Sequence, residues 1–117
     1  MQKIQIGVIG CGNISDAYFK GAARSGLIQV KSCADLRPES AQAKAATYQL
    51  RAQSVEELLA DPEISMVVNL TIPLAHAAVS KQILNAGKHV YSEKPLAATF
   101  AQAQEIMDLA AQKGLRV

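Results

Sequence analysis

The sequence predicts an α/β protein in which helices cover both faces of a doubly wound parallel sheet. Runs of β-branched residues alternate with helical patterns along the chain, as in repeated βαβ units. Half of the residues are apolar but only 4% are aromatic, a composition that suits alanine-rich helices packed on a buried sheet. The first β-branched run ends at Gly10 and Gly12, and a helical pattern follows at once. A chain of 117 residues can form one core, so we expect a single three-layer domain over residues 1–117.

Each expected element has signals at its ends. Pro38 suits the first turn of the second helix, and Ser54 with Glu57 has the spacing of a capping box at the start of the third. Gly87 and Gly114 follow the last two helical patterns, where a left-handed residue commonly ends a helix. The strands are expected at 4–10, 29–35, 65–71 and 88–92, and the helices at about 13–24, 38–48, 54–61, 74–86 and 99–113, with 115–117 as the start of a fifth strand.

Composition and charge argue against several classes of function. The formal net charge is +2 and the basic residues are scattered, which argues against a nucleic-acid interface. We find neither an apolar stretch of membrane-spanning length nor the pattern of a secretory leader, so a cytoplasmic location without membrane partners is expected. The two cysteines, Cys11 and Cys33, form neither a CxxC pair nor a metal-ligand pattern with His76 or His89. We therefore expect buried thiols and no metal site.

The turn around Gly10 and Gly12 is the first candidate binding site. Glycines allow a sharp turn and a close approach of the backbone to a pyrophosphate, and the N–H groups at the start of the next helix favour an anion. Asn13 and Ile14 lie at that helix start, and Ser15 stands where such turns usually have a third glycine or alanine. A tight strand-to-helix turn without a ligand has the same glycines, so a dinucleotide site also requires an acidic residue farther along the chain.

Asp35 supplies that acidic residue at the end of the second expected strand. A carboxylate at this position accepts hydrogen bonds from the adenosine ribose and repels a 2′-phosphate, which favours NAD over NADP. Arg37 argues for the opposite preference, because a guanidinium can bind that phosphate or stack on adenine. NAD is the expected cofactor, NADP is the alternative, and Arg37 could also simply face solvent at the start of the helix.

Thr71, Pro73 and His76 follow the third expected strand, at the edge of the sheet where a cofactor would lie. Thr71 and Pro73 are expected to shape the floor of the site. His76 falls in the first turn of a helix, where the helix dipole favours a neutral ring. Two roles fit this position of His76: a catalytic one, or a structural one in which a single hydrogen bond fixes the loop.

The tripeptide Glu93-Lys94-Pro95 ends the fourth expected strand. Lys94 has a side chain long enough to bring its ammonium beside a nicotinamide, where it could stabilise an alkoxide or relay the proton of a hydroxyl group. Pro95 would hold this loop rigid. An exposed ion pair between Glu93 and Lys94, of little energetic value, is the structural alternative.

Together these motifs resemble the N-terminal domain of the glucose-fructose oxidoreductase and inositol dehydrogenase family (Gfo/Idh/MocA), an NAD(P)-binding Rossmann domain. The resemblance covers the whole chain and is most specific at its last motif. It is carried by residues 7–14, Asp35, residues 71–76 and residues 86–96.

The resemblance implies an NAD(P)-dependent oxidoreductase that passes hydride between the nicotinamide and a sugar, a cyclitol or a related hydroxylated substrate. It also implies that Glu93 approaches the nicotinamide ribose, that Lys94 contacts the reacting hydroxyl, and that the bond between Lys94 and Pro95 is cis. Many members have one more residue between the proline and the histidine than separates Pro73 from His76, which leaves the role of His76 open.

Members of the family continue into a C-terminal α/β domain that lines the substrate pocket and usually forms the oligomer interface. The resemblance therefore implies a chain truncated at its C-terminal end, which binds cofactor without turnover, and a homo-oligomeric parent. Three alternatives stay open: a non-catalytic NAD(H) sensor, which has no need of Lys94; a methyltransferase using S-adenosylmethionine, whose fold usually has a glycine where Ile14 stands; and a family member that uses NAD transiently in glycoside cleavage.

Overall fold

The computed structural model describes residues 3–93 and 96–117. Its five strands form one parallel sheet in the order β3-β2-β1-β4-β5, so the direction of winding reverses after β1. This arrangement confirms the predicted doubly wound sheet. The elements are β1 (Ile4–Ile9), α1 (Ser15–Arg24), β2 (Ile28–Ala34), α2 (Pro38–Tyr48), β3 (Arg51–Ala52), α3 (Val55–Ala60), β4 (Met66–Asn69), α4 (Pro73–Asn85), β5 (His89–Ser92) and α5 (Phe100–Lys113).

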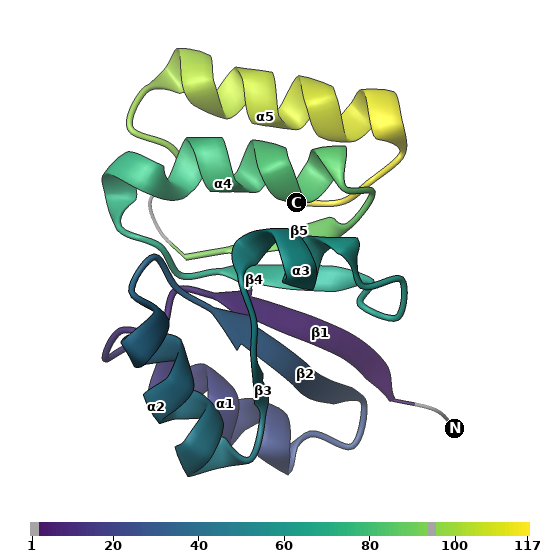
Figure 1. Cartoon of the computed structure of the whole chain (residues 1–117). Coiled ribbons are helices and arrows are strands. Elements are labelled where there is room, and N and C mark those ends of the chain that lie inside the picture. The colour runs from purple at the N-terminus through teal and green to yellow at the C-terminus, as the bar shows by residue number, and fades with distance from the viewer. Residues whose placement is uncertain (1–2, 94–95) are drawn as a thin grey trace.

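The helices form two layers that enclose the sheet (Figure 1). Helices α1 and α2 cover one face, and α3, α4 and α5 cover the other, which confirms the predicted three-layer architecture. Aliphatic side chains that alternate along the strands fill a separate core on each face. The first core contains Ile6, Val8, Cys11, Phe19, Cys33, Ala41, Val68 and Leu70; the second contains Ile9, Ala34, Leu58, Ile64, Val67, Ala77, Ile83, Leu84, Val90, Ile106 and Ala110.

The predicted helix ends are present. Ser54 Oγ accepts a hydrogen bond from the backbone N–H of Glu57 at 3.1 Å, and the Glu57 carboxylate accepts one from the N–H of Ser54 at 3.0 Å. This is the expected capping box at the start of α3. Gly87 and Gly114, after α4 and α5, have φ angles of 82° and 67°, the left-handed conformation that ends a helix.

The two outer sides of the sheet, at β3 and beside β5, differ from the prediction. The short strand β3, which pairs Arg51 with Ser32 and Ala52 with Cys33, is absent from the predicted elements because Arg and Ala carry no strand signal. Residues 115–117, expected to begin a strand, are not a strand in the structure. The N–H of Val90 donates to the carbonyl of Arg116 at 2.9 Å, so the segment follows β5 with this single ladder-like bond.

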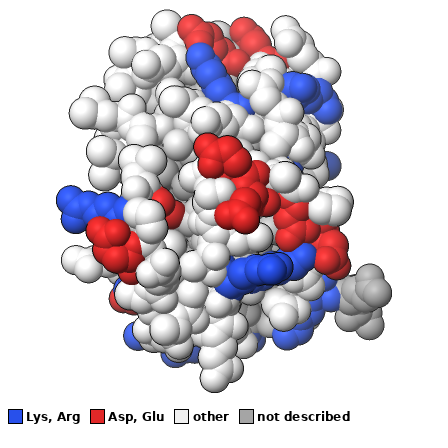
Figure 2. Space-filling view, in the orientation of Figure 1, with Lys and Arg blue, Asp and Glu red and all other residues white. Residues whose placement is uncertain are grey.

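Acidic side chains gather over the centre of the face shown in Figure 2, where α3 lies, and a basic side chain borders them. Among the described residues, Lys31 Nζ lies 2.7 Å from a carboxylate oxygen of Asp61 and of Glu63, which follow α3 in the chain. Within the described parts of the chain, no helix is both long enough and apolar enough to pass through a membrane.

Candidate functional site

A cleft of about 570 Å³ opens at the carboxyl edge of the sheet, beside the point where the winding reverses. Ligands of doubly wound proteins bind at this place, because the loops after two neighbouring strands diverge there. The cleft brings together five of the predicted site residues: Gly10, Gly12, Asp35, Arg37 and Thr71. Residues that the sequence analysis did not select complete the lining: Ile9, Leu36, Ser40, Val55, Glu56, Leu70, Ile72, Val79 and Gln82.

Gly10 and Gly12 differ in what a side chain at each position would meet. Gly10 has a φ of 105°, and a Cβ atom on it would lie 2.6 Å from the carbonyl group of Leu70. Gly10 is therefore required by the fold, because it lets β1 turn away while touching the loop after β4. A Cβ on Gly12 would meet no atom within 4 Å. Gly12 thus faces open space on the cleft, where a ligand can approach the backbone closely.

The segment between Gly12 and α1 presents backbone N–H groups. The N–H groups of Gly12, Asn13 and Ile14 donate to no other described residue, whereas their carbonyls accept from the first residues of the helix at 3.1 to 3.4 Å. Unpaired N–H groups at a helix start, together with the helix dipole, form an anion-binding site. Ser15 is fully buried, and its hydroxyl donates to the Gly12 carbonyl at 2.6 Å. A small residue with a hydroxyl therefore stabilises the turn at the position of the usual third glycine.

Asp35 joins the loop after β2 to the glycine turn. Its Oδ2 accepts a hydrogen bond from the backbone N–H of Cys11 at 2.6 Å, and its Oδ1 accepts one from the N–H of Arg37 at 2.8 Å. The sequence predicts that this carboxylate accepts hydrogen bonds from a ribose, and it gives no signal for these two backbone bonds. A carboxylate has about four lone-pair sites, so Asp35 keeps acceptor capacity for a ligand while it holds the turn.

Two exposed apolar side chains stand at the mouth of the cleft. Leu36, after β2, is 80% exposed, and Ile72, after β4, is 64% exposed. Both line the cleft. Large apolar side chains in this position offer flat contacts to an aromatic ring. Each directly follows the end of a predicted strand, at 35 and at 71, so an apolar residue at that position is the signal that could have found them.

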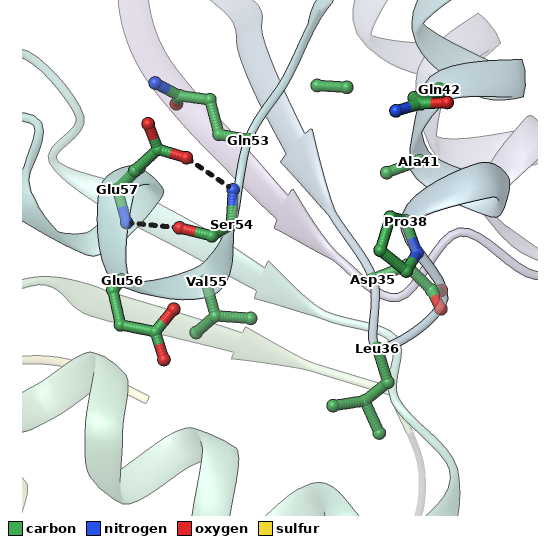
Figure 3. Close-up of a pocket in the computed structure, with 11 residues that line it drawn as sticks. Asp35, Leu36, Pro38, Ala41, Gln42, Gln53, Ser54, Val55, Glu56 and Glu57 are labelled. Carbon is green, nitrogen blue, oxygen red and sulfur yellow. Dashed lines mark hydrogen bonds between the residues drawn. The ribbon is translucent and has the colours of Figure 1, made fainter.

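A second cavity, of about 390 Å³, adjoins the cleft between α2 and α3 and is drawn in Figure 3. Asp35, Leu36, Val55 and Glu56 line both spaces. In Figure 3 the side chains of Leu36 and Val55 lie at the same end of this cavity, and the capping box of α3 forms its wall. Two carboxylates, those of Asp35 and Glu56, and one guanidinium, that of Arg37, are thus among the groups that line the cleft.

Asn69, the last residue of β4, organises the start of α4. Its Nδ2 donates to the His76 carbonyl at 3.0 Å and to Ser80 Oγ at 2.9 Å, and its Oδ1 accepts from the N–H and the hydroxyl of Thr71 at 3.2 and 2.7 Å. Asn69 is fully buried. Its amide is thereby satisfied on both sides and fixes the loop that carries Thr71 and Pro73, which is the first residue of α4.

His76 is not among the residues that line the cleft. Its side chain is 1% exposed, and Nδ1 lies 3.4 Å from the hydroxyl of Ser92, at the end of β5. A ring buried to this degree offers almost no surface for direct contact with a substrate. The burial favours the structural role for His76 over the catalytic one.

Glu93 follows β5 at the far side of the carboxyl edge. Its backbone N–H donates to the Asn69 carbonyl at 3.2 Å, and its carboxylate accepts a hydrogen bond from the hydroxyl of Tyr18 on α1. Lys94 and Pro95, for which we predicted a catalytic lysine and a cis bond, lie outside the described residues. The contact with Tyr18 has no sequence signal, because the two residues are 75 positions apart.

Both thiols are buried, as expected. Cys11 Sγ lies 3.5 Å from the Ala34 carbonyl, and Cys33 Sγ lies 3.5 Å from the Ala41 carbonyl. Contact with Cys33 and burial raise the pKa of the Cys11 thiol, which keeps it protonated and unreactive. Among residues 3–93 and 96–117, no three His, Cys, Asp or Glu side chains are grouped so that they could hold a metal ion.

Comparison with known proteins adds a family and its cofactor to this geometry. A family model described as "Oxidoreductase family, NAD-binding Rossmann fold" (GFO_IDH_MocA) matches residues 4–117. Inositol 2-dehydrogenase of Salmonella typhimurium is 31% identical over 119 residues, which cover 97% of this chain and 35% of that protein.

Two solved structures are similar over nearly the whole chain. The WlbA dehydrogenase from Bordetella pertussis, in complex with NADH and UDP-GlcNAcA, gives a TM-score of 0.94 at 29% identity over 99% of this chain and 36% of that one. Biliverdin reductase from Synechocystis, in complex with biliverdin and NADP+, gives a TM-score of 0.89 at 32% identity over 97% of this chain and 36% of that one.

The chain spans about a third of the length of the relatives that it matches. The matched family binds NAD, and the two solved structures contain NADH and NADP+. These findings confirm the predicted NAD(P) cofactor. The preference for NAD over NADP stays a prediction.

Proposed function

Because the chain belongs to the Gfo/Idh/MocA oxidoreductase family, as its motifs predicted, we propose that it is the cofactor-binding domain of an enzyme that oxidises or reduces a sugar, a cyclitol or a related hydroxylated compound. The observation that carries the proposal is the composition of the cleft, where open space at Gly12, the carboxylate of Asp35 and two exposed apolar side chains meet at one edge of the sheet. The names of inositol 2-dehydrogenase and of the WlbA complex with UDP-GlcNAcA support the substrate class.

The residues of the cleft, with the two residues that follow Gly12, fit the parts of a dinucleotide. The N–H groups of Gly12, Asn13 and Ile14 would hold the pyrophosphate, because they have no protein partner among the described residues. Asp35 would accept the adenosine ribose hydroxyls with its remaining lone pairs. The apolar side chains after β2 and β4 would bracket the adenine.

The reacting end of the cofactor would lie toward the end of β5. A bound nicotinamide supplies the hydride acceptor or donor. We propose that Glu93 contacts the nicotinamide ribose and that Lys94 holds the substrate hydroxyl and moves its proton at Nζ. Thr71 and Pro73 would form the floor, and His76 would support it from below through the contact with Ser92.

We propose NAD as the preferred cofactor. Asp35 and Glu56 both line the region in which an adenosine ribose would lie, and their negative charges disfavour a 2′-phosphate. Arg37 lines the same cleft and is the group that would favour NADP. Two carboxylates against one guanidinium make the surroundings net negative.

Isothermal titration of the 117-residue chain with NADH and NADPH tests the proposal. We expect NADH to bind more tightly, and Asp35→Asn to reduce its advantage over NADPH by about tenfold, since about 1.4 kcal/mol corresponds to that factor. Asp108→Asn, an exposed residue of α5, is the matched control and should leave both affinities unchanged. Tighter binding of NADPH, abolished by Arg37→Ala, would reverse the cofactor preference, and a chain that binds neither cofactor would contradict the proposal itself.

The proposal also divides binding from turnover. We expect the 117-residue chain to bind cofactor without oxidising polyols, and a protein of the relatives' length to carry the activity. Oxidation of a polyol by the purified chain would contradict this division. Replacement of Lys94 by alanine in a longer, active protein tests its role, because loss of turnover with retained NADH binding is expected only for a residue that acts on the substrate.

A further inference from the structure

One hydrogen bond at the carboxyl edge joins segments that are far apart in the sequence. The hydroxyl of Tyr18, on α1, donates to Oε2 of Glu93, which directly follows β5. Helix α1 begins at the glycine turn. The bond therefore connects the proposed pyrophosphate site with the segment that leads into Lys94.

The Tyr18 ring is held independently of this hydrogen bond. It meets the ring of Tyr91 edge-on, with centroids 6.3 Å apart and an interplanar angle of 68°. Both rings line an apolar recess of about 270 Å³ over the face of the sheet that α1 covers. Aromatic packing thus fixes the direction of the hydroxyl, so the bond to Glu93 costs little additional ordering of Tyr18.

The backbone of Glu93 is anchored to β4, but this anchor does not fix the direction of its side chain. The bond from its N–H to the Asn69 carbonyl, at 3.2 Å, prolongs the pairing of β5 with β4. The carboxylate stands several rotatable bonds away from this anchor, so it needs a second contact to hold one direction. Tyr18 supplies that contact.

The protonation states of the pair suit this role. The hydrogen bond with Glu93, and to a smaller extent burial, raises the pKa of Tyr18 to about 12. At neutral pH the phenol is therefore a neutral donor, and the side chain of Glu93 accepts its hydrogen bond. A neutral donor leaves the charge of the carboxylate and its other lone pairs available for the hydroxyl groups of a ligand.

We propose that Tyr18 is a positioning residue that fixes the carboxylate of Glu93 for contact with the nicotinamide ribose. The inference rests on the proposed function, in which Glu93 makes that contact. Tyr18 does not line the cleft, and it acts through Glu93. The consequence is that the nicotinamide half of the cofactor depends on Tyr18 and the adenosine half does not.

The two halves can be separated by titrating the chain with NADH and with ADP, which has the adenosine and the pyrophosphate but lacks the nicotinamide ribose. We expect Tyr18→Phe to weaken NADH binding by about three- to tenfold, less than the loss of a direct hydrogen bond to a charged group because Tyr18 acts through Glu93, and to leave ADP binding unchanged. Phenylalanine keeps the ring contact with Tyr91, so the variant removes the hydroxyl alone.

Tyr48→Phe is the matched control. The Tyr48 hydroxyl also donates to a carboxylate, that of Asp16 at 2.7 Å, and its ring also packs on another ring, that of Phe19 with centroids 4.9 Å apart. Neither Tyr48 nor Asp16 is among the residues that line the cleft. We expect this variant to bind NADH and ADP as the unmodified chain does.

A spectroscopic readout tests the hydrogen bond itself. Ultraviolet absorbance follows tyrosinate formation, and the chain has three tyrosines. We expect Glu93→Gln to move one of the three titrations to lower pH, toward the ordinary value of about 10, and Tyr18→Phe to remove that same titration.

Three results would overturn the inference. NADH affinity unchanged in Tyr18→Phe would show that Glu93 needs no positioning, and equal losses for NADH and ADP would show a merely structural role. Unchanged tyrosine titrations in Glu93→Gln would show that the hydrogen bond is absent in solution. Failure of the proposed function looks different, because the unmodified chain would then bind neither ligand before any substitution is made.

Discussion

Polar groups at the amino edge of the sheet, where the strands begin, are paired within the protein, whereas several at the carboxyl edge, where the strands end, are not. At the amino edge, Lys88 is only 5% exposed and its Nζ donates to the carbonyls of Asp61 and Ile64 at 2.7 and 2.6 Å. At the carboxyl edge, N–H groups around Gly12 have no protein partner among the described residues, and Leu36 is left exposed beside them. Groups that satisfy one another stabilise the fold, whereas groups left open are available to a ligand. Substitutions at the amino edge should therefore change stability without changing binding, and substitutions at the open groups of the carboxyl edge should do the reverse.

The largest effect is expected for Gly10→Ala, because this residue of the binding edge serves the fold. The substitution forces a side chain into a φ of 105° and places its Cβ 2.6 Å from the backbone of Leu70. Backbone strain and overpacking together should lower the free energy of unfolding by about 2 to 5 kcal/mol. Urea unfolding measures the change.

Gly21→Ala is the control for Gly10→Ala. Gly21 lies inside α1, and a Cβ on it would meet no atom within 4 Å. We expect a gain of about 0.5 to 1 kcal/mol, since alanine is the better helix former. A Gly10→Ala variant as stable as Gly21→Ala would contradict the tight approach of the glycine turn to the loop after β4.

Lys88→Met tests the amino edge. The variant keeps most of the side-chain volume but leaves the carbonyls of Asp61 and Ile64 without their donor, and the relief from burying a charge offsets part of that loss. We expect the free energy of unfolding to fall by about 2 kcal/mol. NADH affinity should not change.

The exposed Lys113, in the last turn of α5, is the matched site for a Lys→Met control. Its replacement should leave the unfolding free energy within about 0.5 kcal/mol of that of the unmodified chain. If both variants were equally stable, the buried ammonium would contribute nothing to the fold. If Lys88→Met weakened NADH binding as well, the two edges would not be independent.

Gly12→Ala should have the opposite profile to Lys88→Met. Its Cβ meets no protein atom within 4 Å but fills the space where a pyrophosphate would touch the backbone. We expect NADH binding to weaken by about tenfold or more, equivalent to at least 1.4 kcal/mol, and stability to change by less than about 1 kcal/mol. Calorimetric titration and urea unfolding of the same preparation show whether the two effects separate. Unchanged NADH affinity would place the ligand elsewhere.

The sequence was informative where local geometry decides the structure. The glycine turn, the capping box of Ser54 and the parallel alternation of strands and helices all follow from residues a few positions apart, and the structure contains them. Strand β3 was missed because its two residues, Arg51 and Ala52, take their conformation from pairing with β2 and not from their own propensity.

The candidate site was predictable only in part for the same reason. Asp35 could be placed in the cleft from its position after a strand, but its bonds to the N–H groups of Cys11 and Arg37 depend on how two loops pack together. The contact between Tyr18 and Glu93 depends on how α1, which follows β1, lies relative to β5, two places from β1 in the sheet. No local pattern encodes this arrangement. Long-range side-chain bonds of this kind had to be found in the structure.

The smallest expected effect is a pH dependence at the amino edge. Hydrogen bonds from Lys31 Nζ and from the N–H of Glu63 hold the pKa of Asp61 below its ordinary value. The unfolded chain therefore binds a proton at Asp61 more readily than the folded chain does, so this contribution to stability is present at neutral pH and is lost as the pH falls below about 4.

In Asp61→Asn the unfolding free energy should decrease less steeply as the pH falls. Asp108→Asn, at an exposed position of α5, serves as the control. Urea unfolding at a series of pH values between about 3 and 6 measures the slope. The effect should be modest because Glu63, the other partner of Lys31, is largely exposed. At neutral pH, Asp61→Asn should leave NADH affinity unchanged, since Asp61 does not line the cleft. A weaker affinity for NADH would mean that charge at the amino edge acts on the carboxyl edge through the sheet, and the separation of stability from binding would then hold for neutral contacts alone.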